Sequence, residues 1–433
     1  MPASADGDAG LPPSDITDPG LAEAGRARIE WAQRGMPVLR LLTGRFTAQR
    51  PFAGLTVAAC LHVTAETAGL VNALRAGGAR VFLAASNPLS TQDDVAAALA
   101  AAGAAAVFAR AGVDQLGYDE HIHRALDSGP AGPDLVIDDG GDLVNTLHEQ
   151  HPDLLAAVRG GCESTATGVI RLRRMADEGA LAFPMVAADA TTTKRMFDNT
   201  CGTGQSVIDG VLRATNTLLA GRVVVVAGYG ACGRGIAQAA RGLGAQVVVT
   251  EVDPVRALEA ILSGYRVLPM REAAAAGEVI ITVTGSRDVV AAGHLAVLRD
   301  GTILANAGHF DAEIDVPALA GAAVQVTRDV RPHADEYTLD DGRRVVLLAE
   351  GRVVNLVAAE GNPPQVMDVS FAGQALVLRW LAREHEALSP GVHEVPSVID
   401  EEIARLTLES SGARIDTLTE AQREYLNSWR TAP

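Results

Sequence analysis

A lysine and an aspartate four residues apart, Lys194 and Asp198, are a pair whose types and spacing could do chemistry. If this segment is helical, both side chains lie on one face, because residues four apart are neighbours on a helix. An ammonium and a carboxylate placed in this way could hold one hydroxyl group between them. Most such pairs are surface ion pairs. This one has several polar neighbours and lies between two α/β patterns, so we interpret it as part of a site.

A glycine-rich turn follows about thirty residues later. A run of valines leads into Gly228, Gly230 and Gly233, and after a helical pattern and a second apolar run comes Glu251. Glycines at this spacing allow a tight turn, the approach of a pyrophosphate and close packing of helix on strand. The helix N-terminus then offers unpaired N–H groups to the phosphates. Because a carboxylate at Glu251 would bind the adenosine ribose and repel a 2′-phosphate, the pattern predicts an NAD site rather than an NADP site.

A second α/β alternation precedes this turn. Polar residues follow its expected strands, among them His62, Thr64, Glu66 and Asp139. Parallel sheets place ligands just beyond the carboxyl ends of their strands, so we expect these groups to line a cleft between two sheets. Taken alone, His62 could be a core histidine, and Asp138 could bond the backbone of the following glycine turn. We interpret Asp138 in that structural way and Asp139 as functional.

These patterns predict the α/β class, with two Rossmann-like, doubly wound parallel-sheet domains and a C-terminal helical arm. The expected division is a disordered arm over 1–15 and a substrate or catalytic domain over 16–203, completed by 363–395. An NAD-binding Rossmann domain is expected over 204–362, and the arm over 396–433.

Composition excludes several classes of function. The 433 residues include 36 basic and 53 acidic side chains, for a net charge of −17, which argues against nucleic-acid and anionic-membrane partners. The four cysteines show neither metal-type nor disulfide-type pairing, so we predict no metal and a reduced, cytoplasmic setting. Neither a signal peptide nor a membrane-spanning segment is expected, and the predicted partner is a small molecule.

The chain resembles the S-adenosylhomocysteine hydrolase family from about residue 15 to residue 426. Several of the matching segments are highly specific to that family, and they cover both α/β patterns. They are Lys194 and residues 60–68, 90–93, 138–142, 197–199, 226–230, 306–311 and 349–356.

The resemblance implies a particular chemistry. NAD oxidises the 3′-hydroxyl of an adenine nucleoside to a ketone, which makes the C4′ proton acidic enough for a protein base, so that the 5′-substituent can leave. A nucleophile then adds, and the hydride returns to the ketone. The resemblance also implies a homo-oligomer.

Site residues follow from the same resemblance. Lys194 and Asp198 would grip the 3′-hydroxyl, and Lys194, as a lysine of lowered pKa, would assist its deprotonation. Asp139 would be the base for C4′. The remaining assignments are His62 and His309 for protons near the leaving group, Thr64 and Glu66 for the purine, and Thr165, Thr167, Asn199, Thr284, Asn306 and Asn355, with the glycine turn, for the cofactor.

The chain departs from the family in the expected substrate shell. Ser164 stands where the family has a sugar-contacting glutamate, Glu360 replaces an uncharged residue, and Asn362 replaces a histidine near the purine. Thr203 replaces a cysteine, so we expect no thiol beside the nicotinamide. The family's C-terminal lysine and tyrosine, which reach a neighbouring subunit's cofactor, are missing after Trp429.

A divergent family member with an altered substrate shell accounts for these departures. We favour a nucleoside dehydratase, which would oxidise the sugar, eliminate water at C4′ and C5′, and reduce the ketone to give an exocyclic alkene. The alternative is a divergent S-adenosylhomocysteine hydrolase, which releases adenosine and homocysteine. A hypothesis from a different class is a non-catalytic, NAD-binding regulator.

Overall fold

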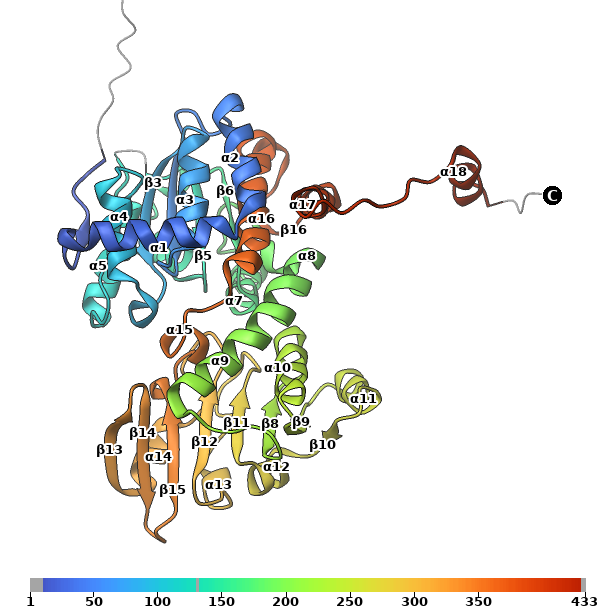
Figure 1. Cartoon of the computed structure of the whole chain (residues 1–433). Helices are drawn as coiled ribbons and strands as arrows, with labels where there is room; N and C mark the ends of the chain where they lie inside the picture. The colour runs from blue at the N-terminus through green and yellow to red at the C-terminus, as the bar shows by residue number, and fades with distance from the viewer. Residues whose placement is uncertain (1–10, 130–131, 430–433) are drawn as a thin grey trace, which may run out of the picture.

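The computed structural model describes residues 11–129 and 132–429, which form two α/β units, one above the other in Figure 1. Each unit is built on one eight-stranded sheet with helices on both faces. The predicted α/β class with two doubly wound sheets and a helical C-terminal region is therefore confirmed.

Every strand of the first sheet is parallel to its neighbours. The strands between its two edges are short and fully or almost fully buried, as expected where both faces of a parallel sheet are covered. In spatial order they are β1 (Asp15–Ile16), β4 (Ala106–Ala109), β3 (Arg80–Ala85), β2 (Thr56–Leu61), β5 (Leu135–Asp138), β6 (Gly160–Glu163), β7 (Pro184–Ala187) and β16 (Gly391–Glu394).

Two apolar clusters cover the faces of this sheet. The larger cluster joins one face to α1 (Ala22–Arg34), α2 (Pro37–Gln49), α3 (Thr67–Ala76), α4 (Asp93–Ala101), α16 (Pro364–Glu384) and α17 (Ser397–Ser410). The other cluster joins the opposite face to α5 (Gln115–Leu126), α6 (Asp142–Gln150) and α7 (Ala166–Asp177).

The second sheet carries the glycine-rich turn, which lies between the strand Val223–Ala227 and the helix Ala231–Gly242. Its strands in spatial order are β10 (Arg266–Val267), β9 (Gln246–Thr250), β8 (Val223–Ala227), β11 (Val279–Thr282), β12 (Thr302–Asn306), β15 (Arg344–Leu348), β14 (Ala334–Leu339) and β13 (Ala323–Arg331). One face is covered by α9 (Thr203–Thr215), α10 (Ala231–Gly242) and α15 (Val354–Val357). The other is covered by α12 (Met270–Ala276), α13 (Ala292–Leu295) and α14 (Val316–Ala322). The more exposed α11 (Pro254–Leu262) links β9 to β10.

The second sheet is not parallel throughout. β14 pairs antiparallel with both β13 and β15. Only residues 332–333 separate β13 from β14, and so short a connection can join antiparallel strands but cannot make a parallel crossover. The expected parallel sheet therefore ends in a hairpin at this edge.

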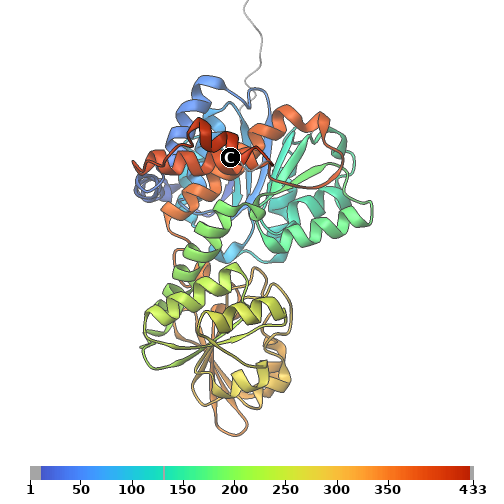
Figure 2. The same ribbon diagram turned by 90° about the vertical axis from the view of Figure 1, so that its right-hand side faces the viewer.

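The chain passes between the two units twice. The first passage contains η4 (Ala188–Ala190), α8 (Thr192–Lys194), a π-helix labelled η5 (Arg195–Gly202), and α9. The second runs from α15 into α16, and Figures 1 and 2 show both passages at the junction. π-Helical turns are rare in proteins overall, but those that occur are often found at functional sites. This fits the position of Asp198 within η5 and of Lys194 directly before it.

The C-terminal region differs from the expected arm. α17 packs against α16 and α2, with Ile399, Ile403 and Leu406 buried, and only the segment after Ser410, which contains α18 (Glu420–Leu426), extends away from the molecule (Figure 1). At the other end, most of the expected disordered arm lies outside the described residues, and Asp15 already belongs to β1. No helix in the described part of the chain is long and apolar enough to cross a membrane.

The contact between α17 and α8 predicts a measurable effect on stability. Asp400 accepts hydrogen bonds from the backbone N–H groups of Thr192 and Thr193, at 2.9 and 3.2 Å, and from the Thr193 hydroxyl. Loss of such a cap costs about 1 kcal/mol. We expect Asp400→Ala to lower the free energy of unfolding by about that amount in urea titrations. Glu401→Ala, at an exposed ion pair on the same helix, should change it by less than about 0.5 kcal/mol; equal effects of the two variants would contradict the capping role.

Candidate active site

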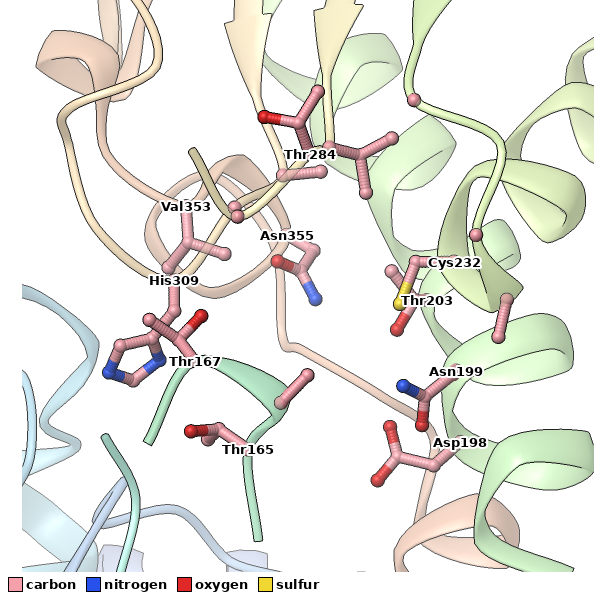
Figure 3. Close-up of a pocket in the computed structure, with 18 of the residues that line it drawn as sticks. Thr165, Thr167, Asp198, Asn199, Thr203, Cys232, Thr284, His309, Val353 and Asn355 are labelled. Carbon is pink, nitrogen blue, oxygen red and sulfur yellow. The ribbon is translucent and has the colours of Figure 1, made fainter. Parts of the chain in front are cut away.

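A cavity of about 1240 Å³ lies between the carboxyl ends of the two sheets. Figure 3 shows side chains from both units around it, with His309 and Thr167 on one side and Asp198 and Cys232 on the other. It is lined by all the predicted catalytic residues (His62, Asp139, Lys194, Asp198, His309), all the predicted substrate residues (Thr64, Glu66, Ser164, Glu360, Asn362), and the cofactor residues Thr165, Thr167, Asn199, Gly228, Gly230, Glu251, Thr284 and Asn355. The predicted cofactor residues Gly233 and Asn306 do not line it.

Gly233 acts through packing. A Cβ atom at this position would lie 2.0 Å from the carbonyl oxygen of Gly228, so only glycine lets α10 approach the turn. Gly228 itself has φ +107°, which favours glycine. Glu251, directly after β9, accepts a hydrogen bond from Tyr229 N at 2.8 Å and so ties the second strand to the turn.

Asn306 is fully buried at the end of β12. Its Nδ2 donates to the carbonyl oxygens of Gly308, Phe310 and Gly351, and its Oδ1 accepts from Gly308 N at 2.7 Å. These bonds fix the loop that carries His309. The side chain therefore supports a cavity-lining residue without lining the cavity itself.

The residues around the glycine turn fit a dinucleotide. Gly228 and Gly230 line the cavity where the N-terminus of α10 faces it, as a pyrophosphate site requires. Farther in, the amide oxygens Oδ1 of Asn199 and Asn355 are buried and accept no hydrogen bond from the described residues. Two acceptors without donors suit a bound carboxamide, because a buried polar group is costly unless it is hydrogen-bonded.

Lys194 is held by two carboxylates. Its Nζ lies 2.9 Å from Asp189 Oδ1 and 3.6 Å from Asp198 Oδ2, and all three side chains are largely buried. Burial alone would lower the pKa of Lys194, but the charges of Asp198 and Asp189 outweigh burial and raise it above its ordinary value. The expected lysine of lowered pKa is therefore wrong for this arrangement of side chains. The group is an ammonium, which can donate a hydrogen bond and stabilise negative charge.

Asp198 has further partners. Ser370 Oγ donates to its Oδ2 at 2.8 Å, and Asn362 Nδ2 donates to its Oδ1 at 2.7 Å. Both donors lie in the second passage between the units, whereas Asp198 lies in the first. The carboxylate is therefore fixed from both passages.

Asp139 lies in the turn between β5 and α6, followed by Gly140 and Gly141 with φ +112° and +85°. Burial is the main cause that raises its pKa to about 7; the nearby charge of Lys194 lowers this pKa and the charge of Asp198 raises it. The neighbouring Glu163 fixes the turn, because its Oε1 accepts from Gly140 N at 3.0 Å. A carboxyl group with a pKa near neutrality suits a general base.

Asp138 has a different surrounding. Its Oδ2 accepts a hydrogen bond from Val144 N at 2.9 Å in the first turn of α6, and its side chain is fully buried. Asp138 thus bonds backbone, but in α6 rather than in the glycine turn, where Gly140 N donates to Glu163 instead.

The two predicted histidines come from different units and lie 6.0 Å apart between ring centroids. Burial and the neighbouring His309 lower the pKa of His62 to about 3, so its ring is neutral. Its Nδ1 lies 2.7 Å from Ser90 Oγ, whose hydroxyl donates to the carbonyl oxygen of Asn87. That hydroxyl has one proton, so when it donates to Asn87, Nδ1 of His62 is the donor and Nε2 is left as a proton acceptor.

The predicted substrate residues that line the cavity differ in burial. Glu66 is buried, and burial raises its pKa, whereas Glu360 is largely exposed and lies 3.7 Å from Arg213. Ser164 is 8% exposed, so the space beside it is inside the cavity rather than at its mouth.

Several lining residues were missed by the sequence analysis. Asp189 was not paired with Lys194, although it belongs to the same polar segment. Gln374 lies in α16, which its apolar pattern marked as core, and its buried Oε1 has no partner among the described residues. A polar residue within that apolar run was the available signal.

The absence of a thiol beside the nicotinamide stays a prediction, but the cavity does contain a thiol. Cys232, the second residue of α10, lines the cavity close to Thr203, as Figure 3 shows. Burial is the main cause that raises the pKa of this thiol to about 11, although the charge of Lys194 lowers it, so the group is a neutral thiol. The described residues contain no cluster of side chains suited to a metal ion.

Two glycine substitutions separate the turn's packing from its ligand contact. We expect Gly233→Ala to lower both the melting temperature of the NAD-free protein and its affinity for NAD, because the added Cβ meets backbone. Gly230→Ala should lower the affinity alone, since the nearest heavy atom to its Cβ is Arg256 Nη1 at 3.8 Å. Overpacking costs about 1–3 kcal/mol. Scanning calorimetry measures the melting temperature, and titration measures the affinity for NAD. An equal loss of melting temperature in the two variants would contradict the assignment of Gly233 to packing and Gly230 to ligand contact.

Comparison with known proteins follows the same division of the chain. A family model described as S-adenosyl-L-homocysteine hydrolase matches residues 14–153, and one described as S-adenosyl-L-homocysteine hydrolase, NAD binding domain, matches residues 199–361.

Relatives match over almost their whole length. An Aquifex aeolicus protein named adenosylhomocysteinase is 54% identical, covering 96% of this chain and 98% of that protein. An Aeropyrum pernix protein of the same name is 55% identical, covering 96% and 99%. A Methanopyrus kandleri protein named S-inosyl-L-homocysteine hydrolase is 50% identical, covering 96% and 97%. This chain therefore belongs to the S-adenosyl-L-homocysteine hydrolase family, and its cofactor is NAD.

Proposed function

We propose that this enzyme hydrolyses S-adenosylhomocysteine to adenosine and homocysteine through transient oxidation at the 3′-position of the sugar. The observation that carries the proposal is the shared cavity, in which the Lys194–Asp198 pair, Asp139 and the glycine turn face one space. When bound, NAD would accept the hydride from C3′ and later return it.

The protein groups divide the remaining work. The Asp198 carboxylate accepts the hydrogen bond of the 3′-hydroxyl and takes its proton as the hydride leaves C3′, and the Lys194 ammonium stabilises the negative charge that develops on this oxygen. Asp139, as a carboxylate, takes the C4′ proton. Nε2 of His62 accepts a proton from the water that replaces homocysteine, and His309 lies beside it on the side of the other unit.

The names of the relatives favour hydrolysis over the dehydration that the sequence analysis preferred. The names also point to two different purine bases, because two relatives are named for an adenosyl substrate and one for an inosyl substrate. Adenine remains our proposal, and S-inosylhomocysteine belongs in the same assay.

Dehydration of a modified adenine nucleoside remains a second candidate because of Ser164. This small side chain lines the cavity where the family has a glutamate, and the space it leaves would accept a substituent on the sugar. The same departure is compatible with a hydrolase that binds ribose less tightly.

Mass spectrometry of the products distinguishes the candidates. With NAD supplied, we expect S-adenosylhomocysteine to give adenosine and homocysteine, because the elimination and addition groups line one cavity. Lys194→Ala should still bind NAD but lose turnover. Loss of water from a sugar-modified nucleoside, with no release of homocysteine, would replace the hydrolase proposal by the dehydratase.

The raised pKa of Asp139 predicts the pH dependence of elimination. Only the carboxylate can take the C4′ proton, so the rate of C4′ proton exchange should rise with pH and level off above about pH 7. Exchange of deuterium from solvent into the nucleoside measures this step. Asp139→Asn should abolish the exchange while NAD binding persists; a rate that falls as pH rises through 7 would contradict Asp139 as the base.

Restoring the family's carboxylate tests the role of Ser164. We expect Ser164→Glu to lower the KM for S-adenosylhomocysteine by about tenfold, because a carboxylate is a stronger acceptor for a ribose hydroxyl than a serine. Ser164→Ala serves as the control for lost serine contacts. An increased KM in Ser164→Glu would instead indicate that the space beside residue 164 is needed by the native substrate.

We also propose a homo-oligomer. Exposed apolar side chains gather on α11, where Val255, Leu258, Ile261 and Leu262 are each more than half exposed. α18 likewise exposes Tyr425 and Leu426 on a segment that leaves the molecule. Contacts between copies would cover such surfaces.

A further inference from the structure

We propose that Asn362 is a positioning residue that couples the substrate-binding carboxylate of Asp198 to the cofactor-facing amide of Asn355 through Ser206. The inference rests on the proposed function for what Asp198 and Asn355 contact. It concerns a residue at which this chain departs from the family's histidine.

The coupling is a chain of three hydrogen bonds. Asn362 Nδ2 donates to Asp198 Oδ1 at 2.7 Å, Ser206 Oγ donates to Asn362 Oδ1 at 2.8 Å, and Asn355 Nδ2 donates to Ser206 Oγ at 3.1 Å. Ser206 and Asn355 are buried, and Asn362 is partly buried. We call these four residues the relay.

Asp198 sets the direction of every bond in the relay. A carboxylate can only accept, so the amide nitrogen of Asn362 must face it and the amide oxygen must face Ser206. The Ser206 hydroxyl then donates to that oxygen, and its own oxygen accepts from Asn355. This order leaves Oδ1 of Asn355 without a donor among the described residues and on the lining of the cavity.

The relay joins the two passages between the units. Asp198 and Ser206 lie in η5 and α9 of the first passage, and Asn355 and Asn362 lie in and after α15 in the second. Asn362 fits closely there, because a Cβ atom at Gly202 would lie 2.9 Å from its amide nitrogen. The Asn362 amide thus fixes the Asp198 carboxylate and, through Ser206, the Asn355 amide oxygen that faces the cofactor site.

Removal of the Asn362 amide should affect both ends. Without its acceptor, the Ser206 hydroxyl can donate to Asn355 instead, which turns the Asn355 amide and presents its nitrogen rather than its oxygen to the cavity. Asp198 loses a bond of 2.7 Å as well. Misplacement of groups that bind the reacting hydroxyl lowers rate more than affinity.

The test uses the full-length protein with NAD removed and restored. We would measure the Kd of NAD by titration, the rate at which adenosine reduces bound NAD from the absorbance of the reduced nicotinamide, and the Kd of 3′-deoxyadenosine, which lacks the hydroxyl that Asp198 would contact. The variants are Asn362→Asp, which keeps the shape of the side chain, Asn362→Ala, Ser206→Ala and Ser370→Ala.

Asn362→Ala should reduce NAD at least about tenfold more slowly and raise the Kd of NAD about fivefold, with the Kd of 3′-deoxyadenosine within about twofold of wild type. Asn362→Asp loses the donor to Asp198 but keeps an acceptor for Ser206, so it should slow reduction and leave the Kd of NAD within about twofold of wild type. Ser206→Ala should raise the Kd of NAD similarly. Ser370→Ala, which removes the other neutral donor to Asp198 outside the relay, should slow reduction and leave the Kd of NAD within about twofold.

An unchanged Kd of NAD in Asn362→Ala and Ser206→Ala, as in Ser370→Ala, would overturn the coupling, and unchanged reduction of NAD in the two Asn362 variants would overturn the positioning of Asp198. Failure of the proposed function has a different signature. In that case the wild-type protein itself would bind NAD, but adenosine would not reduce the bound NAD.

Discussion

The buried ammonium of Lys194 between two carboxylates is the interaction on which the rest of the site depends. A charge in so enclosed a place is tolerated only when it is paired and hydrogen-bonded, and Asp189 and Asp198 provide both. Their positions require the tight succession of η4, α8 and η5. That succession is fixed from outside by Asp400 of α17, which caps α8, and by Ser370 of α16, which holds Asp198. Helices from the distant end of the sequence thus determine where the central charge lies.

The same arrangement explains why neighbouring carboxyl groups differ. Asp189 bonds directly to the ammonium, and although burial alone would raise its pKa, Lys194 holds that pKa below its ordinary value. Asp139 is also buried but has no direct ion pair, so burial prevails and its pKa rises to about 7. One cavity therefore contains a carboxyl group whose pKa is lowered by its ion pair and another whose pKa lies near neutrality. This division is what proton abstraction beside a ketone requires.

Much of this could be predicted from the sequence, where the signal was local. Gly228, Gly230 and Glu251 are close along the chain, and strand ends place His62 and Asp139 at one sheet edge. Contacts between distant segments gave no such signal: the Asp400 cap, the Asn362 contact with Asp198, and the buried bonds of Asn306 each join residues that only the fold brings together. The raised pKa of Lys194 was missed for a different reason: Asp198 and Asp189 are close to it in the sequence, but no pattern specifies how near their carboxylates come to the ammonium.

The turn at Gly140 has a consequence for the order of events. A Cβ atom there would lie 2.6 Å from Nε2 of His309, so the missing side chain lets a ring from one unit enter the turn of the other. Lys194 and Asp198, by contrast, belong to a single passage and keep their spacing however the units sit. Separation of the two units would therefore withdraw His309 from His62 and leave the spacing of Lys194 and Asp198 unchanged. In the proposed hydrolysis, the groups that handle protons at the leaving group would then be complete only while the two units are together.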